Sequence, residues 1–169
     1  MDLYFIAKQK ELGELLVRKA LKKNKTIVIG ESCTGGIISS IITSVPGSSK
    51  VFDQGLVTYS NKAKIDLLGV KEGTLKDQGA VSKDVVTEMV SGLFQISPQA
   101  NVALSISGVA GPGNLNSQKP EGLIWIAYGV KGSMIKTSML RIDPLGRNYV
   151  RQKSSIEALK LLLKLLENP

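Results

Sequence analysis

Apolar residues recur along this chain with two different periods. Spacings of three and four residues are typical of amphipathic helices and predict helices over about 5–23, 35–43, 61–68, 83–96 and 145–167. Short runs rich in β-branched residues predict strands over about 26–30, 54–59, 102–106, 123–130 and 134–142. Lys131 and Gly132 separate the last two strands by a tight turn, which predicts an antiparallel hairpin. Helices early and late in the chain should cover both faces of a mixed sheet, an α/β fold.

The composition narrows the chemistry that this chain can carry out. Its 169 residues, 1–169, fit a single domain. It contains no histidine and one cysteine, Cys33, which excludes an intramolecular disulfide, Ser-His-Asp and Cys-His catalysis and His-ligated metal sites. Proton transfer is then left to Lys, Asp, Glu, Tyr or water. No apolar run is long enough to span a bilayer and the N-terminus lacks a signal-peptide pattern, so we expect a cytoplasmic protein with no membrane partner.

The net charge of +8 comes mostly from lysine, and part of the excess lies at 18–25, near the end of the first helix. Cations are stabilised at the C-terminus of a helix, so these lysines are explained largely as exposed, hydrated side chains at the end of the first helix. The alternatives are a nucleic-acid patch and a general attraction for anionic substrates. Nucleic-acid interfaces often use arginine and interleaved aromatic residues, and both are scarce here.

The loop after the first strand, 30–36, is rich in small residues and leads into a helix. Backbone N–H groups at such a helix start suit an anion. The loop fits neither a Walker A motif nor a dinucleotide fingerprint, and a tight strand-to-helix turn capped by Thr34 explains it equally well.

Two further clusters offer hydroxyl groups and a lysine. Ser48 and Ser49 follow Pro46-Gly47 in a turn. Ser60 or Asn61 is the expected N-cap of the next helix, which places Lys64 in its first turn, close to Tyr59. The helix dipole and partial burial would lower the pKa of Lys64 and make it a usable base, although most isolated lysines are simply exposed.

Two clusters near the end of the chain complete the set. Ser107, Gly108 and Gly111 open a long glycine-rich loop after the third strand, where N–H groups could form an oxyanion hole. Arg147 and Arg151 lie four residues apart on one helix face and could clamp a phosphate or carboxylate, or be ordinary surface charges.

In this order, the clusters resemble the CinA C-terminal domain family, the nicotinamide-nucleotide amidases. The matching segments are 31–36, 47–49, 57–61 with 63–64, 68–70, 79–82, 107–112, 119–120 with Gly122, and 146–147. The resemblance implies a three-layer α/β/α domain with a five-stranded mixed sheet. It also implies hydrolysis of nicotinamide mononucleotide to nicotinic acid mononucleotide and ammonia. We expect no cofactor, and the absence of histidine together with the single cysteine leads us to expect no metal.

The resemblance also implies roles for individual residues. It places the catalytic hydroxyl and lysine at Ser49 and Lys64, with Tyr59 and Ser32 as further catalytic members. The nucleophile is chosen among Ser32, Ser48 and Ser49. The expected substrate-binding residues are Ser48, Thr34, Gly35, Gly36, Ser107, Gly108, Gly111 and Arg147. Asn114 and Glu121 stand where the family commonly has glycine and valine, which puts the details of the 113–122 loop in doubt.

The expected partner is a small-molecule nucleotide, bound by a homo-oligomer that recognises no specific nucleic acid. The alternative is a non-catalytic nucleotide- or nucleic-acid-binding module linked to competence or DNA repair, which would use the basic surface and need no hydroxyl–lysine pair. A third interpretation is an amidase of a different nucleotide or small amide.

Overall fold

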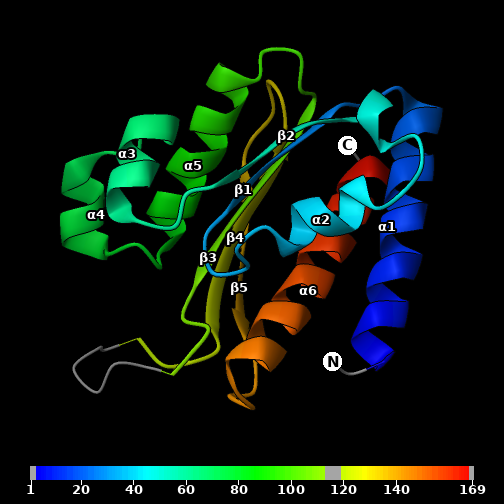
Figure 1. Cartoon of the computed structure of the whole chain (residues 1–169). Helices are drawn as coiled ribbons and strands as arrows, with labels where there is room; N and C mark the ends of the chain where they lie inside the picture. Colours follow the sequence, from blue (N-terminus) through cyan, green and yellow to red (C-terminus); the bar gives the residue numbers. More distant parts are fainter. Residues whose placement is uncertain (1–2, 113–118, 168–169) are drawn as a thin grey trace.

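A five-stranded sheet with the order β2-β1-β3-β4-β5 forms the centre of the computed structural model, which describes residues 3–112 and 119–167 (Figure 1). The strands are β1 (Ile27–Glu31), β2 (Phe52–Val57), β3 (Val102–Gly108), β4 (Leu123–Val130) and β5 (Lys136–Arg141). The first three run parallel, and β4 and β5 run antiparallel to their neighbours. The mixed sheet expected from the sequence is therefore confirmed.

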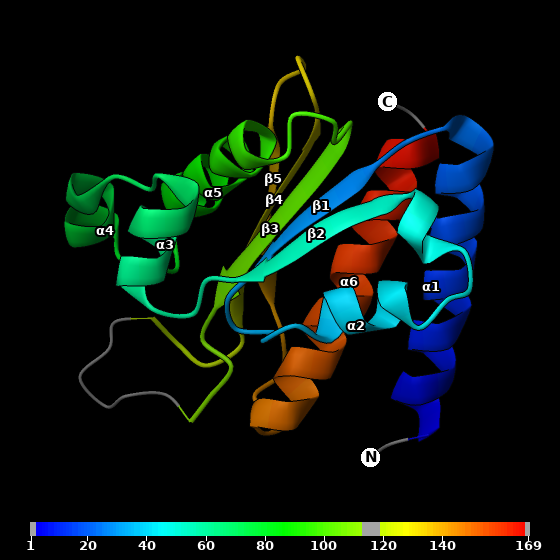
Figure 2. The same ribbon diagram turned by 45° about the horizontal axis from the view of Figure 1, so that its top comes forward.

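Helices cover both faces of this sheet (Figures 1 and 2). One face carries α1 (Leu3–Lys23), α2 (Ile37–Thr43) and α6 (Arg147–Glu167), and the other carries α3 (Asn61–Leu68), α4 (Glu72–Gln78) and α5 (Lys83–Ile96). Each face has its own buried apolar core, which gives the three layers of the predicted α/β/α fold. Within the described residues, no helix has the length and apolar character needed to cross a membrane.

The main difference from the sequence-based elements is α4, which the apolar pattern does not predict. Leu75 is the one buried residue of this helix, so its sequence has no helical stripe. Its start is held from outside: Glu88 of α5 accepts hydrogen bonds from the Lys71 N–H and the Thr74 hydroxyl, both at 2.8 Å. A tertiary cap of this kind leaves no local signal in the sequence.

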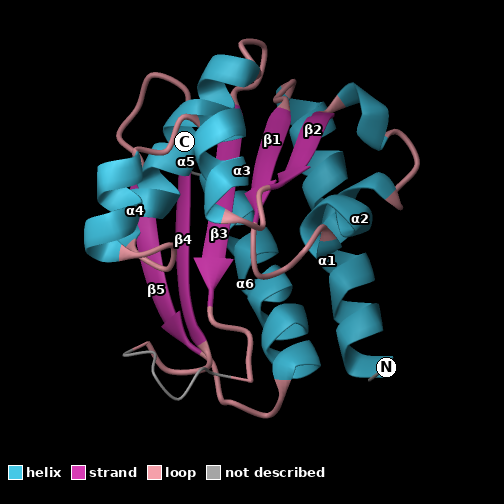
Figure 3. Cartoon of the chain, turned by 60° about the vertical axis from the view of Figure 1, so that its left-hand side comes forward, coloured by secondary structure: helices cyan, strands magenta, loops and turns pink. Residues whose placement is uncertain are grey.

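The parallel strands bring their carboxyl ends to one edge of the sheet (Figure 3). Glu31 at the end of β1 is in register with Val57 of β2 and with Ile106 of β3. Segments that are far apart in the sequence, those following 31, 57 and 108, therefore leave the sheet side by side. In open α/β sheets this edge is where ligands bind.

Candidate active site

Lys64 is a fully buried lysine at this edge of the sheet. The Ser60 side chain accepts a hydrogen bond from the Ala63 N–H at 3.0 Å, which confirms Ser60 as N-cap and places Lys64 in the first turn of α3. The Lys64 ammonium group contacts the Thr58 carbonyl at 2.7 Å, the Tyr59 carbonyl at 3.3 Å and the Ser32 hydroxyl at 3.1 Å. The lysine therefore joins the loop after β2 to the loop after β1.

Burial lowers the pKa of Lys64 from 10.5 to about 8. A neutral amine has two N–H donors and one lone pair. The Thr58 and Tyr59 carbonyls can engage the two donors, which leaves the lone pair facing the hydroxyl of Ser32. The arrangement suits transfer of the serine proton to the lysine.

Ser32 supplies the hydroxyl because it is the first residue after β1. Its N–H donates to the Ile106 carbonyl of β3 at 3.0 Å, which fixes the backbone beside the strand end. The neighbouring Cys33 is a poor nucleophile, since burial raises the pKa of its thiol to about 12. The structure thus distinguishes the hydroxyl from the thiol in the same loop.

A cavity of about 190 Å³ surrounds this pair. It is lined by Ser32, Cys33, Tyr59, Lys64, Ala80, Val81, Ser107, Gly108, Ala110 and Arg147. Six of the residues singled out in the sequence come together here: Ser32, Tyr59, Lys64, Ser107, Gly108 and Arg147. The Ser107 hydroxyl donates to the Ala80 carbonyl at 2.7 Å, so it ties β3 to the segment before α5.

Arg147 lies at the exposed side of the cavity. Its guanidinium donates to the Gly111 carbonyl at 2.8 Å and to the Tyr59 hydroxyl at 2.9 Å. It therefore connects the start of α6 with the loops that follow β2 and β3. The Glu121 carboxylate packs against Gly111: a Cβ added at Gly111 would come within 2.3 Å of the carboxylate carbon. Asn114, the other position that departs from the family pattern, lies outside the described residues.

The expected contact between Ser49 and Lys64 is not formed. Ser48 and Ser49 lie in a short 3₁₀ turn, Ser48–Lys50, which precedes β2, whereas Lys64 meets the segment that follows it. Val51, next in the chain, already accepts from the Ile27 N–H at 2.7 Å, at the start of β1. The six residues of β2 keep the two ends roughly 20 Å apart. Ser32, not Ser48 or Ser49, is the serine beside Lys64.

The expected anion cradle in the loop after β1 is already filled by the chain itself. Glu31, fully buried, accepts hydrogen bonds from the N–H groups of Gly36, Ile38 and Ser39 at 2.8–3.2 Å. The glutamate therefore caps α2 in place of Thr34. Thr34 is buried, and Gly35 and Gly36 face a groove on the other side of the loop, so these three do not line the cavity.

Two positively charged residues near the site bind backbone carbonyls, a role that the sequence did not predict for either of them. Arg151 of α6 donates to the Cys33 carbonyl at 3.2 Å and to the Thr34 carbonyl at 2.8 Å, so it holds the loop that carries Ser32. Its spacing from Arg147 was the available signal, but it pointed to a ligand rather than to the backbone. Lys119 donates to the Val81 carbonyl at 2.7 Å beside the cavity, and no pattern in the sequence predicts that contact.

The donor groups of the described residues give no cluster of three or more His, Cys, Asp or Glu that could hold a metal ion. Glu31, the acidic residue closest in sequence to Ser32, is committed to the start of α2. What the cavity offers is a hydroxyl, an amine with a lowered pKa and a guanidinium. These groups suit acyl transfer through a serine activated by lysine.

Comparisons with known proteins show the family of this chain. The CinA C-terminal domain family matches residues 9–166, and the chain therefore belongs to this family. Nicotinamide-nucleotide amidohydrolase PncC of Enterobacter agglomerans is 42% identical over 92% of this chain and 96% of its own length. A CinA-like protein of Thermotoga sp. (strain RQ2) is 40% identical over 93% of this chain, which spans 38% of that relative.

Solved structures show the same fold. The competence/damage inducible protein CihA of Agrobacterium tumefaciens has a TM-score of 0.89 and 35% identity, covering 94% of this chain and 95% of its own. A CinA superfamily protein of Klebsiella pneumoniae has a TM-score of 0.90 and 29% identity, covering 95% and 99%. The family expected from the sequence motifs is thus confirmed.

Proposed function

We propose that this protein is an amidohydrolase that converts nicotinamide mononucleotide to nicotinic acid mononucleotide and ammonia. The observation that carries the proposal is the buried Lys64 amine, 3.1 Å from the Ser32 hydroxyl, in a cavity at the sheet edge. The similarity to the nicotinamide-nucleotide amidohydrolase PncC, which extends over nearly the whole chain, supports the choice of substrate.

The first half of the reaction forms an acyl-enzyme. Neutral Lys64 takes the proton from the Ser32 hydroxyl as its oxygen attacks the carboxamide carbon. The resulting Lys64 ammonium then protonates the amide nitrogen, the carbon–nitrogen bond breaks and ammonia leaves. The substrate acyl group remains on Ser32 as an ester.

The second half returns the enzyme to its starting state. Lys64, neutral again, takes a proton from a water molecule, which attacks the ester carbon. The Ser32 oxygen leaves and recovers its proton from Lys64, and the product carries a carboxylic acid that ionises. The N–H groups of Ser32 and Val109 are already bonded to the Ile106 and Leu123 carbonyls, so we do not assign the oxyanion to them.

The size of the cavity indicates how a nucleotide would lie. A volume of about 190 Å³ suits the carboxamide and its ring, and the ribose phosphate then extends past the exposed Tyr59 and Arg147. Arg147 uses two of its terminal nitrogens on Gly111 and Tyr59 and keeps further N–H groups for an anion. We assign the phosphate to Arg147 on this basis.

Ammonia release from nicotinamide mononucleotide by the purified protein tests the proposal. We expect Ser32→Ala and Lys64→Met each to lower kcat by several orders of magnitude, and the double variant to be little worse than either, because the pair acts as a unit. Ser49→Ala and Lys62→Met, which change an exposed serine and an exposed lysine, serve as matched controls and should stay near the wild-type rate.

Two outcomes would overturn this assignment. Absence of ammonia release from the nucleotide by the folded protein would remove the amidase activity and favour the non-catalytic binding module. Full activity of Ser32→Ala together with loss in Ser49→Ala would return the nucleophile to Ser49 and contradict the geometry.

A further inference from the structure

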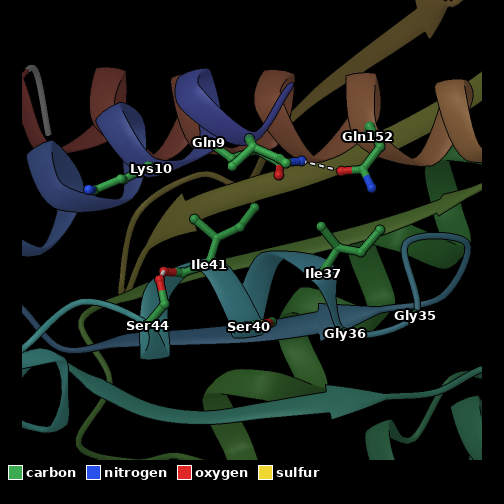
Figure 4. A pocket seen from close by; sticks show the side chains of 10 residues that line it. Gln9, Lys10, Gly35, Gly36, Ile37, Ser40, Ile41, Ser44 and Gln152 are labelled. Carbon is green, nitrogen blue, oxygen red and sulfur yellow. Dashed lines mark hydrogen bonds between the residues drawn. The ribbon is translucent and has the colours of Figure 1, made fainter. Parts of the chain in front are cut away.

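A second and larger hollow lies on the other side of the Ser32 loop, between α1, α2 and α6 (Figure 4). This groove has a volume of about 610 Å³, roughly three times that of the catalytic cavity. Gly35 and Gly36 line it, whereas Ser32 and Cys33 of the same loop line the cavity. The proposed amidase reaction makes no use of this space.

Two glutamines form its polar wall. Gln9 of α1 and Gln152 of α6 are 8% and 7% exposed, and the Gln9 amide nitrogen donates to the Gln152 oxygen and, at 3.0 Å, to the Ser155 hydroxyl. The Gln9 amide oxygen has no hydrogen-bond partner among the described residues, and it is not fully enclosed by protein atoms. It therefore opens onto the groove, as Figure 4 shows.

The Gln152 amide nitrogen provides a donor beside this acceptor. Its contact with the Asn148 side-chain oxygen is 3.5 Å long, at the outer limit of a hydrogen bond. Figure 4 shows this nitrogen on the side of Gln152 that faces α2. The Gln9 oxygen, an acceptor, and the Gln152 nitrogen, a donor, thus both face the groove, on two side chains that are joined by the bond between their amides.

The opposite wall, formed by α2, combines two isoleucines with the hydroxyl groups of Ser40 and Ser44. Ile37 and Ile41 project from α2 toward the two glutamines (Figure 4). Lys10 is the one charged side chain among the described residues that line the groove, and it is exposed. A ligand that fits must present a flat apolar face to the isoleucines and an N–H group next to a carbonyl to the glutamines.

We propose that this groove is a second small-molecule site that takes an uncharged planar lactam or carboxamide. The ligand N–H donates to the Gln9 oxygen, and its carbonyl accepts from the Gln152 nitrogen. A carboxylate of the same shape is rejected because it would place negative charge against the Gln9 oxygen. The bound ligand contacts Gly35 and Gly36, in the loop that carries Ser32.

Binding of 2-pyridone, a planar lactam without a hydrolysable primary amide, tests the site directly. We expect saturable chemical-shift changes at Gly35, Gly36, Ile37 and Ile41 in NMR titrations of the full chain. N-methyl-2-pyridone, which lacks the N–H donor, should bind at least about tenfold more weakly. These measurements do not depend on amidase activity, so their failure would leave the proposed reaction unaffected.

Substitutions in the groove test which side chains hold the pyridone. Gln152→Glu keeps the acceptor for Gln9 but removes the donor, and Ser40→Trp fills the groove from α2 without changing the glutamines; each should abolish the pyridone shifts. Thr43→Trp, exposed on the same helix and outside the groove lining, is the matched control and should bind normally.

Equal binding of both pyridones, or unchanged binding in Ser40→Trp, would overturn the proposal. So would shifts at the same residues on dilution of the free protein, together with a change of mass in light scattering. That result would make the groove an interface between two copies of this chain.

Discussion

The lowered pKa of Lys64 gives the sharpest test of the proposed mechanism. An exposed lysine with a pKa of 10.5 is almost entirely protonated at neutral pH and is no base. Burial in α3 lowers the pKa of this lysine to about 8. The neutral fraction at pH 7 then rises from roughly 0.03% to about 10%, a gain of about 300-fold.

The same shift should appear in the stability of the protein. In the unfolded chain Lys64 returns to a pKa of 10.5, so between pH 8 and 10.5 the unfolded state binds more protons than the folded state. Stability from this group therefore rises with pH across that window. Below pH 8 the full cost of the buried charge is present. The shift corresponds to about 3 kcal/mol over the window.

Steady-state kinetics and denaturation measure these two effects. The kcat/KM of the wild type should rise with pH and level off above an apparent pKa of about 8. Lys64→Met has no charge to bury, so its free energy of unfolding should exceed that of the wild type at pH 7. This difference should shrink as the pH rises to 10. Lys64→Arg should be inactive throughout, because guanidinium cannot act as a base.

Either of two results would refute the reasoning. A rising limb near pH 10 would mean an exposed lysine, and a flat profile would mean that another group takes the proton. The difference in unfolding free energy between the wild type and Lys64→Met is the second test. If it stays constant with pH, burial does not lower the pKa of Lys64.

Four other results are expected. Arg151→Met should lower kcat at least about tenfold with little change in KM, as measured by steady-state kinetics. The reason is that the guanidinium orients the Cys33 and Thr34 carbonyls rather than the substrate. Glu31→Gln should lower the free energy of unfolding in urea by about 2 kcal/mol, since it weakens the cap on α2. Activity should survive prolonged chelation, because the sequence has no histidine and one cysteine. Nucleic-acid binding from the +8 charge should be weak and disappear at about 200 mM salt in filter-binding assays.

The sequence alone predicts the elements that have a strong periodic pattern. The helical spacing of Leu159, Leu162 and Leu166 and the β-branched run at 27–29 identify α6 and β1, because these residues are buried in the way their spacing requires. The N-cap at Ser60 is also local, since its side chain accepts a hydrogen bond from the N–H group three residues ahead. The family can also be predicted from the sequence, because the short motifs of this chain occur in the same order as in the CinA C-terminal domain family.

Only the tertiary structure decides which serine lies beside Lys64. Ser49 is closer to Lys64 in sequence than Ser32 is, but β2 lies between Ser49 and the lysine and keeps them at its two ends. Ser32 reaches Lys64 because β1 and β2 are parallel neighbours whose carboxyl ends meet.

The roles of Glu31 and Arg151 were decided in the same way. A glutamate at a strand end and an arginine on a late helix are ordinary in sequence, and spacing does not show what they bond. In the fold the Glu31 carboxylate takes the amides of α2 that could have served a phosphate, and Arg151 takes carbonyls of the Ser32 loop. Local patterns determine secondary structure through nearby hydrogen bonds and burial, whereas a catalytic site depends on contacts between segments that only the packed sheet and helices bring together.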